Sequence, residues 1–167
     1  MTTYQFGFIL EQALGHITHT KNLQTTVARD PEVHPYWGLV PFEAEGIAAR
    51  VPLYKSNWTV RAGVRARRAV NHLAAGAALD ALFFHTQVPA VLSTAWLKRI
   101  PSVVSLDATP IQYDALGRVY GHTPGAAWLE RVKWQVNRDC FRAARHLVTW
   151  SAWAKKGLVD EYEVPAE

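Results

Sequence analysis

Short apolar runs along the chain end abruptly at polar residues. Val103–Leu106 is one such run, preceded by Pro101 and stopped by Asp107. Four to eight β-rich residues bounded in this way are typical of a buried strand. Four more strands are predicted: Tyr4–Leu10, Tyr36–Phe42, Ala81–Phe84 and His146–Trp150. The prediction for Tyr36–Phe42 is weaker, because this segment contains Gly38 and Pro41.

Helical patterns separate these runs. The most regular is Gly125–Arg145, where Leu129, Val132, Val136 and Cys140 recur every three or four residues between charged positions. Ser151 is placed to cap a closing helix through its hydroxyl. The other predicted helices are Lys21–Ala28, Thr59–Ala78, Pro89–Lys98 and Ala152–Tyr162.

Two segments are predicted to be loops. Glu11–Thr20 surrounds Gly15, and the polar stretch after Asp107 contains Thr109, Tyr113 and Gly117. Strands and helices therefore alternate, and the strands are too apolar to be half exposed. This order predicts an α/β fold, a Rossmann-like parallel sheet with helices on both faces, in one domain over residues 1–167.

Composition narrows the class of protein only modestly. The chain has 49% hydrophobic and 19% charged residues, as ordinary globular proteins do, and a formal net charge of +4. Its single cysteine, Cys140, lies on an apolar helix stripe and is interpreted as a core residue. With no disulfide framework, no apolar run near 18 residues and no charged start typical of a signal peptide, we expect a cytoplasmic protein.

Polar residues follow four of the predicted strands. In a doubly wound sheet the carboxyl ends of the strands meet at one edge, where ligands bind. We therefore expect a shared site from residues distant in sequence: Gly15, His16 and His19; His85, Thr86 and Gln87; Asp107, Thr109 and Tyr113; and Ser151.

Each candidate has a structural alternative. Gly15 lies where a phosphate could approach a first loop, but no G-x-G-x-x-G is present, so a turn glycine is an equal alternative. His16 and His19 are three residues apart without carboxylate or cysteine partners, which favours ligand contact over a metal site. His85 could exchange a proton or be structural, and Asp107 could serve a ligand or cap a turn.

Arg61, Arg65 and Arg68 fall on one face of the helix predicted over Thr59–Ala78. A solvated face is the favoured interpretation. The alternative is contact with anionic lipid headgroups, which would make the protein peripheral at the inner face of the membrane. The sequence has no basic patch interleaved with aromatic residues, so nucleic-acid binding is not expected.

Three segments resemble the amino-terminal lobe of family 4 glycosyltransferases. They are LFFHTQ at Leu82–Gln87, SVVSLDATP at Ser102–Pro110, and the segment Phe141–Glu167 with its strand, Ser151, helix and Val-Pro-Ala-Glu close. The opening LEQALGHITHTKNL is also similar to the first-loop region of some members. The resemblance spans essentially the whole chain, although each motif alone is loose.

This resemblance implies a retaining enzyme of the two-lobed GT-B architecture that transfers a sugar from a nucleotide-sugar co-substrate to a glycan or lipid-linked acceptor of the cell envelope. It implies that the Gly15–His19 loop faces the donor diphosphate and the acceptor. Asp107 takes the strand end where many members have a histidine, so it would hydrogen-bond an acceptor hydroxyl, with His85 as the second catalytic candidate. No other cofactor and no metal are implied.

The carboxy-terminal lobe of such enzymes holds most of the nucleotide-sugar site. A chain that ends at Glu167 is therefore expected to be an amino-terminal domain, inactive without that lobe in cis or in trans. The alternative function is a non-enzymatic Rossmann-like module that binds a nucleotide or phosphate.

Overall fold

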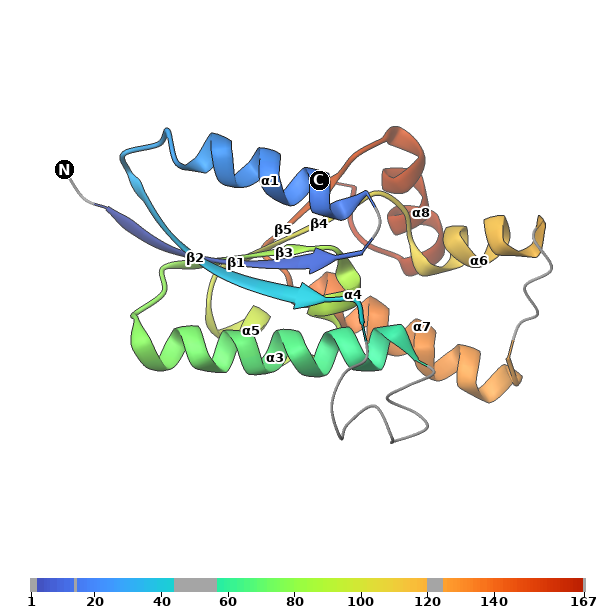
Figure 1. Ribbon diagram of the computed structural model, residues 1–167. Coiled ribbons are helices and arrows are strands. Elements are labelled where there is room, and N and C mark those ends of the chain that lie inside the picture. The colour runs from blue at the N-terminus through green and yellow to red at the C-terminus, as the bar shows by residue number, and fades with distance from the viewer. Residues whose placement is uncertain (1–2, 14, 44–56, 120–124, 167) are drawn as a thin grey trace.

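Five parallel strands form one sheet in the order β2-β1-β3-β4-β5. Residues 3–13, 15–43, 57–119 and 125–166 are described by a computed structural model of the chain (Figure 1). Every neighbouring pair of strands runs parallel. The strands are β1 Tyr4–Gln12, β2 Val33–Pro41, β3 Ala81–His85, β4 Ser102–Leu106 and β5 His146–Thr149.

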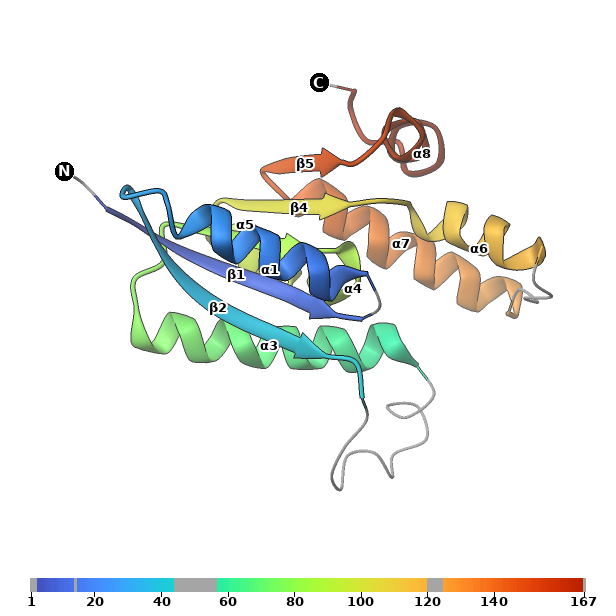
Figure 2. The same ribbon diagram turned by 45° about the horizontal axis from the view of Figure 1, so that its top comes forward.

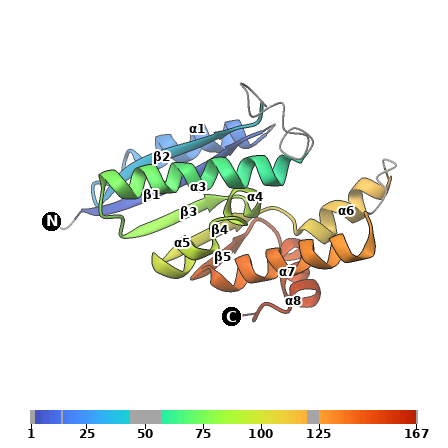
Figure 3. The same ribbon diagram turned by 90° about the horizontal axis from the view of Figure 1, so that it is seen from below.

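Helices cover both faces of this sheet. Helix α1 lies on one face, and α3, α5 and α7 lie on the other (Figures 1 and 3). Helix α8 lies beside the edge strand β5 (Figure 2). The predicted α/β, Rossmann-like architecture is thus confirmed. The helices are α1 His16–Val27, α3 Trp58–Gly76, α4 Gln87–Ala90, α5 Thr94–Arg99, α6 Pro110–Val119, α7 Ala127–Ala143 and α8 Ala152–Tyr162.

The main core lies between the sheet and α3. Alternate strand residues such as Ile9 and Phe84 are fully buried there, against small side chains of α3. A Cβ on Gly38 would lie only 2.7 Å from Cδ1 of Ile9 and 3.2 Å from Cβ of Ala69. The glycine and the alanines therefore let α3 pack closely on β1 and β2.

The face under α1 is covered more lightly. Only Thr20 of α1 is buried, and the sheet beneath it carries aromatic rings: Phe8 stacks on Trp37 with centroids 4.7 Å apart and lies tilted against Phe83 at 5.8 Å. Because side chains alternate along a strand, His85 points to this face while Phe84 points to the core. The histidines of the sequence therefore meet on the lightly covered side.

The prediction of a loop over Glu11–Thr20 is wrong. Strand β1 continues to Gln12, and α1 begins at His16. Helix α1 was missed at its start because it lacks a strong apolar period and because no side chain caps its first turn. Glu11 belongs to the strand, since it is paired with Val40 of β2, and its carboxylate is buried and hydrogen-bonded, a contact that sequence spacing does not reveal.

The polar stretch after Asp107 is also a helix, not a loop. The Thr109 hydroxyl accepts from the Gln112 amide at 3.2 Å, and the Gln112 side chain accepts from the Thr109 amide at 2.9 Å. This reciprocal capping box is followed by Pro110 at the first helical position, where its missing N–H costs nothing. The T-P-x-Q pattern was the signal for α6.

The predicted helix Pro89–Lys98 is divided into α4 and α5. Thr86 begins α4, since its hydroxyl accepts from the Val88 amide at 3.3 Å. Pro89 lies in the first turn of α4, where a helix tolerates proline. The chain then turns at Ser93, whose amide donates to the carbonyl of Ala90 at 2.8 Å.

Helix α7 follows its prediction, but only half of its apolar stripe is buried. Cys140 is fully buried and Val136 packs against the core, whereas Leu129 and Val132 are 46% and 50% exposed. The first turns of α7 run beside α6, beyond the carboxyl ends of the strands (Figures 1 and 2). The sheet therefore ends before it can cover them.

Helix α8 begins and ends where the sequence predicts, and the Ser151 cap is confirmed. The Ser151 hydroxyl accepts from the Ala154 amide at 3.1 Å. None of the helices in the described part of the chain has the length and apolar character needed to cross a bilayer.

Candidate functional site

The carboxyl ends of β1, β3, β4 and β5 lie along one edge of the sheet. Leu10 is paired with His85, His85 with Ser105, and Leu106 with Thr149. Strand β1 is followed by a connection to β2 on one side, and β3 by a connection to β4 on the other. This change of direction between β1 and β3 is the topological switch point, where ligands of open α/β sheets bind.

Three histidines and one tryptophan meet at this edge, and we call His16, His19, His85 and Trp150 the histidine–tryptophan cluster. Nδ1 of His16 lies 2.9 Å from Nε2 of His85, a hydrogen bond between the two rings. The His19 ring stacks on His85 with centroids 4.3 Å apart. The Trp150 ring is parallel to His85 within 9° at 5.2 Å.

Helix α1 explains why its two histidines reach the same partner. His16 is its first residue and His19 lies three residues on, so both side chains project from one face. That face lies over the end of β3, which presents His85. The three-residue spacing of His16 and His19 therefore places both side chains on one face, because these residues are helical.

Burial favours the neutral form of two histidines of the cluster, His85 and His19. His85 is 0% exposed, and burial, together with the neighbouring His19 and His16, lowers its pKa from 6.5 to about 3. The pKa of His19 is also lowered, by burial and by His16. A neutral imidazole has one donor and one acceptor nitrogen. Near pH 7 the rings of His85 and His19 therefore act as hydrogen-bonding groups and not as cations.

Several polar atoms beside the cluster have no partner within the described residues. Nδ1 of His85, Nε2 of His19 and Oε1 of Gln87 are buried without a hydrogen bond. Buried polar atoms are nearly always paired in folded proteins. Atoms of this kind at a switch point are the ones that a polar ligand would satisfy.

Sequence reasoning missed Trp150. Its indole Nε1 donates to the Ser105 hydroxyl at 2.8 Å, which fixes the ring against β4, and the residue is still 46% exposed. Trp150 directly follows β5, and Ser151 comes next. Ser151 was chosen as a candidate because it follows a predicted strand, and the same reason applies to Trp150. The signal was therefore present, but the aromatic residue was assigned to the strand.

Glu11 is the second residue that was missed. Its carboxylate is buried at the end of β1 and accepts from Thr86 Oγ1 and Trp58 Nε1, both at 2.9 Å. These bonds tie β1 to the start of α3 and to the turn after β3. The Thr86 hydroxyl, predicted to bind substrate, is thus engaged in structural hydrogen bonds.

The residues after β4 divide into two kinds. Asp107 is half-buried, and the described part of the chain offers its carboxylate no hydrogen bond or ion pair. Thr109 is fully buried, donates to Oε2 of Glu161 at 2.6 Å and caps α6. Asp107 is therefore available to a ligand, whereas Thr109 has a structural role.

The remaining predicted ligand contacts lie outside the cluster. Tyr113 is 57% exposed on α6, and no hydrogen bond or ring contact joins it to the cluster in the described residues. Ser151 caps α8. Gly15 is exposed at the start of α1, has φ −61°, and would have nothing within 4 Å of an added Cβ. Its backbone therefore does not require glycine.

The arginine face predicted on α3 is corrected by the structure. Arg61 is 6% exposed, donates to the carbonyl of Phe42 at 3.2 Å and lies 5.2 Å from the Trp58 ring. Arg65 donates to the carbonyl of Pro41. Only Arg68 is exposed. The first two arginines stabilise the end of β2, so the three do not form a solvated or lipid-binding surface.

The fold and the cluster together define a Rossmann-like α/β domain with neutral imidazoles and an indole at its switch point. Within the described residues, no three His, Cys, Asp or Glu side chains are arranged to hold a metal ion. No protein-family model matches the sequence, and no curated protein matches it.

Proposed function

We propose that this domain binds the sugar acceptor in a glycosyl transfer, as the amino-terminal lobe of a cytoplasmic, retaining GT-B glycosyltransferase. The observation that supports the proposal is the histidine–tryptophan cluster, with its unpaired ring nitrogens, at the switch point of a parallel sheet. The sequence resemblance to family 4 enzymes points to the same edge.

The chemistry of the cluster suits a sugar. Each sugar hydroxyl both donates and accepts, and a neutral imidazole such as that of the partly exposed His19 has both a donor and an acceptor nitrogen. The apolar face of a pyranose ring would pack on an exposed indole, and Trp150 combines an exposed surface with a ring fixed by Ser105. Aromatic and neutral polar groups together favour a carbohydrate over a multiply charged ligand.

In this proposal the residues have distinct roles. The partly exposed His19 hydrogen-bonds the acceptor sugar, the fully buried His85 holds His16 through their ring–ring hydrogen bond, and the half-buried Asp107 carboxylate accepts a hydrogen bond from an acceptor hydroxyl at the end of the neighbouring strand. A second lobe, in cis or in trans, would hold the nucleotide-sugar. The electrostatic groups that stabilise the departing diphosphate would come largely from that lobe.

Binding measurements on the purified domain test this proposal. A panel of methyl glycosides is titrated and followed by ligand-observed NMR. Trp150→Ala and His19→Ala are expected to weaken the best ligand by tenfold or more. The matched controls are Trp128→Ala, which is 69% exposed on α7, and His72→Ala, which is exposed on α3. Equal effects from cluster and control variants, or no binding by any glycoside, would overturn the proposal.

The alternative, a nucleotide- or phosphate-binding module, depends on the start of α1. No side chain caps this helix, but the His16 and Thr18 amides donate to the carbonyls of Ala13 and Gly15, so of its first three amides only that of Ile17 is left for an anion among the described residues. Calorimetric titration with nucleoside diphosphates separates the two functions. Tight binding that is unchanged in Trp150→Ala would favour the alternative, and absence of heat would leave the sugar site as the candidate.

A further inference from the structure

Helices α3 and α5 carry positive charge with almost no acidic residue beside it. From residue 57 to residue 106 the sequence has six arginines and lysines but one acidic residue, Asp80. The Asp80 carboxylate is already engaged just before β3, where its Oδ2 accepts from the Gln5 amide at 2.7 Å. Helix α7 lies on the same side of the sheet and carries both signs of charge (Figure 3). The excess of positive charge on this side therefore belongs to α3 and α5.

Four of these cations form a surface that we call the basic face: Arg67, Arg68, Lys98 and Arg99. All four are exposed, and none has an ion pair among the described residues. The other two, Arg61 and Arg65, donate to carbonyl groups at the end of β2. The basic face thus differs from the arginine row predicted on α3, with which it shares only Arg68.

One hydrogen bond joins the two helices at the basic face. Nε1 of Trp96 on α5 donates to Oδ1 of Asn71 on α3 at 2.8 Å. The two arginines of α3 precede Asn71 by four and three residues, so they lie one helical turn from this contact. Both cations of α5 lie in its last turn, directly after Trp96 and Leu97. The cations of the two helices therefore lie around the same contact.

Trp96 also holds one guanidinium group in place. Cζ of Arg99 lies 5.2 Å from the centroid of the Trp96 ring, a cation–π contact. No hydrogen bond engages the Arg99 side chain in the described residues. A stacked guanidinium keeps its planar fork of donors, which binds phosphate oxygens in pairs. Arg99 is therefore oriented to receive a phosphate.

The same contact argues against a nucleic acid. Single-stranded nucleic acids bind through aromatic rings on which their bases stack. Trp96 packs on the core on one side and has Arg99 over its ring, so it offers no such platform. The basic face therefore supplies charge without a means of reading bases.

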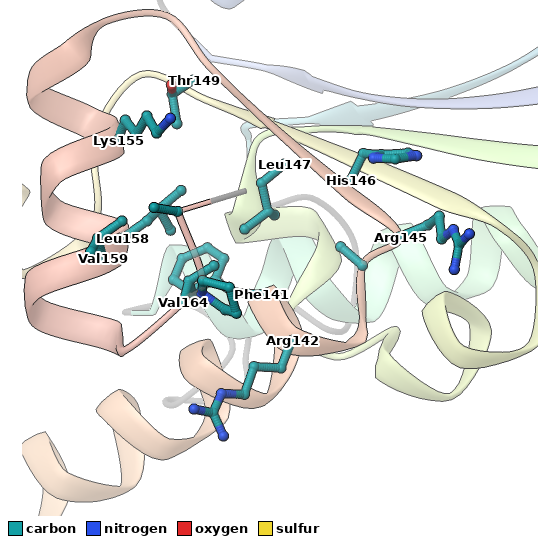
Figure 4. A pocket seen from close by; sticks show the side chains of 13 residues that line it. Phe141, Arg142, Arg145, His146, Leu147, Thr149, Lys155, Leu158, Val159 and Val164 are labelled. Carbon is teal, nitrogen blue, oxygen red and sulfur yellow. The ribbon is translucent and has the colours of Figure 1, made fainter.

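The basic face also offers little to a folded protein or to an enclosed small molecule. Among the large apolar residues between 57 and 106 only Leu92 is exposed, whereas protein interfaces have an apolar, aromatic core. The groove of about 680 Å³ in Figure 4 lies between β5, α8 and the end of α7, and no residue of α3 or α5 lines it. Positive charge of this kind is complementary to an extended anionic surface.

We propose that the basic face binds the headgroups of an anionic membrane surface. Arg99 pairs with a lipid phosphate, and the other three cations neutralise neighbouring headgroups. Each cation near such a surface strengthens binding about fivefold, so the contact is peripheral, reversible and weakened by salt. The histidine–tryptophan cluster lies on the opposite side of the sheet and stays open. This inference is therefore independent of the proposed sugar site.

Vesicles of defined charge test the proposal. The purified chain is mixed with vesicles of phosphatidylcholine alone or of phosphatidylcholine with phosphatidylserine, and the bound fraction is measured by flotation. Binding is expected to be about tenfold tighter or more to the anionic vesicles, and to fall as sodium chloride is added. Equal binding to both kinds of vesicle, no binding to either, or binding that salt does not weaken would overturn the proposal.

Charge-matched variants locate the contact. Arg67→Gln combined with Arg68→Gln is expected to weaken binding to anionic vesicles by about twentyfold, and Arg99→Gln alone by about fivefold. The control, Lys21→Gln combined with Arg29→Gln, removes two exposed cations on and directly after α1, and it should change the affinity by less than about twofold. Thermal unfolding should be nearly unchanged in all variants, because these side chains are exposed. Equal losses in both double variants would overturn the site.

Two competitors identify the anion. Glycerophosphoserine, the soluble headgroup of phosphatidylserine, should not displace the chain from vesicles at equal phosphate concentration, and a short DNA duplex should bind no more tightly than the vesicles at the same ionic strength. Displacement would assign the basic face to a free phosphate, and tighter DNA binding that the Arg67/Arg68 double variant abolishes would assign it to a nucleic acid. Either result would overturn the membrane contact. Glycoside binding should be unchanged in the same double variant, so the sugar site is tested separately.

Discussion

The turn between β4 and α6 and the histidine–tryptophan cluster lie at the same edge of the sheet, but their polar groups are used differently. In the turn, Thr109 and Gln112 bond to each other and to Glu161 and Trp153. In the cluster, one ring nitrogen of His19 and one of His85 have no hydrogen-bond partner among the described residues. A polar residue at a strand end is therefore a site candidate only when the fold leaves its polar atoms free.

Acid is expected to have the largest effect, and it acts on the cluster. His85 has a pKa near 3 in the folded protein and about 6.5 when unfolded, so below pH 6.5 the unfolded chain binds a proton that the native protein does not. His85 therefore does not lower the free energy of unfolding above pH 6.5, and it lowers this free energy increasingly as the pH falls toward 3. Between pH 6 and 4 the loss is about 2.5 kcal/mol.

Urea unfolding at several pH values measures this effect. Carboxylates also make the free energy of unfolding depend on pH, and comparison with His85→Gln removes this shared dependence. The free energy of unfolding of His85→Gln should change less with pH over the same range. His72→Ala, an exposed histidine on α3, should keep the full dependence. If His85→Gln does not fold, His19→Ala replaces it, because the lowered pKa of His19 predicts a smaller change of the same sign. Parallel curves for all variants would contradict the lowered pKa of His85.

Thr109→Ala is expected to destabilise the turn by about 2 kcal/mol, because it removes a helix cap and leaves the Glu161 carboxylate without its donor. Thr109→Ser should restore most of the loss, since the hydroxyl remains. Sugar binding by the folded protein should not change. Thr25→Ala, an exposed threonine on α1, is the matched control. Lost binding without lost stability would move Thr109 into the site.

Gly157→Ala is expected to cost about 1–2 kcal/mol, because the new Cβ would lie 2.5 Å from Nε2 of Gln112. The Gln112 amide cannot move aside freely, since it bonds to Trp153 and Thr109. Gly15→Ala is the control at the start of α1, where an added Cβ meets nothing, and it should be neutral or slightly stabilising in thermal unfolding. Equal effects at the two glycines would contradict the packing described for the turn.

Asp107→Asn is expected to change the free energy of unfolding by less than about 0.5 kcal/mol, since the carboxylate has no partner in the described residues. The same substitution should weaken glycoside binding if Asp107 contacts the acceptor. A loss of stability above 1.5 kcal/mol, on the order of a strong cap, would instead make Asp107 a structural residue.

The elements with strong local signals were predictable. Helix α8 was placed to the residue, because Ser151 is a good cap and a strand stops just before it. Helix α6 was missed although Thr109, Pro110 and Gln112 form a capping pattern, so that error was one of interpretation. The burial of Arg61 was not predictable, because it depends on Phe42 and Trp58 packing around the guanidinium.

By itself, the sequence determined the class of fold and the strand ends that carry polar residues, because apolar periodicity and turn chemistry are local properties. Tertiary structure alone decided which of those residues form a site. His16 and His85 are 69 positions apart and meet only when α1 lies over β3, and Trp150 reaches them from a third element. Burial among these partners lowers the pKa of His85 and leaves its second nitrogen free, and burial is a property of the packed chain.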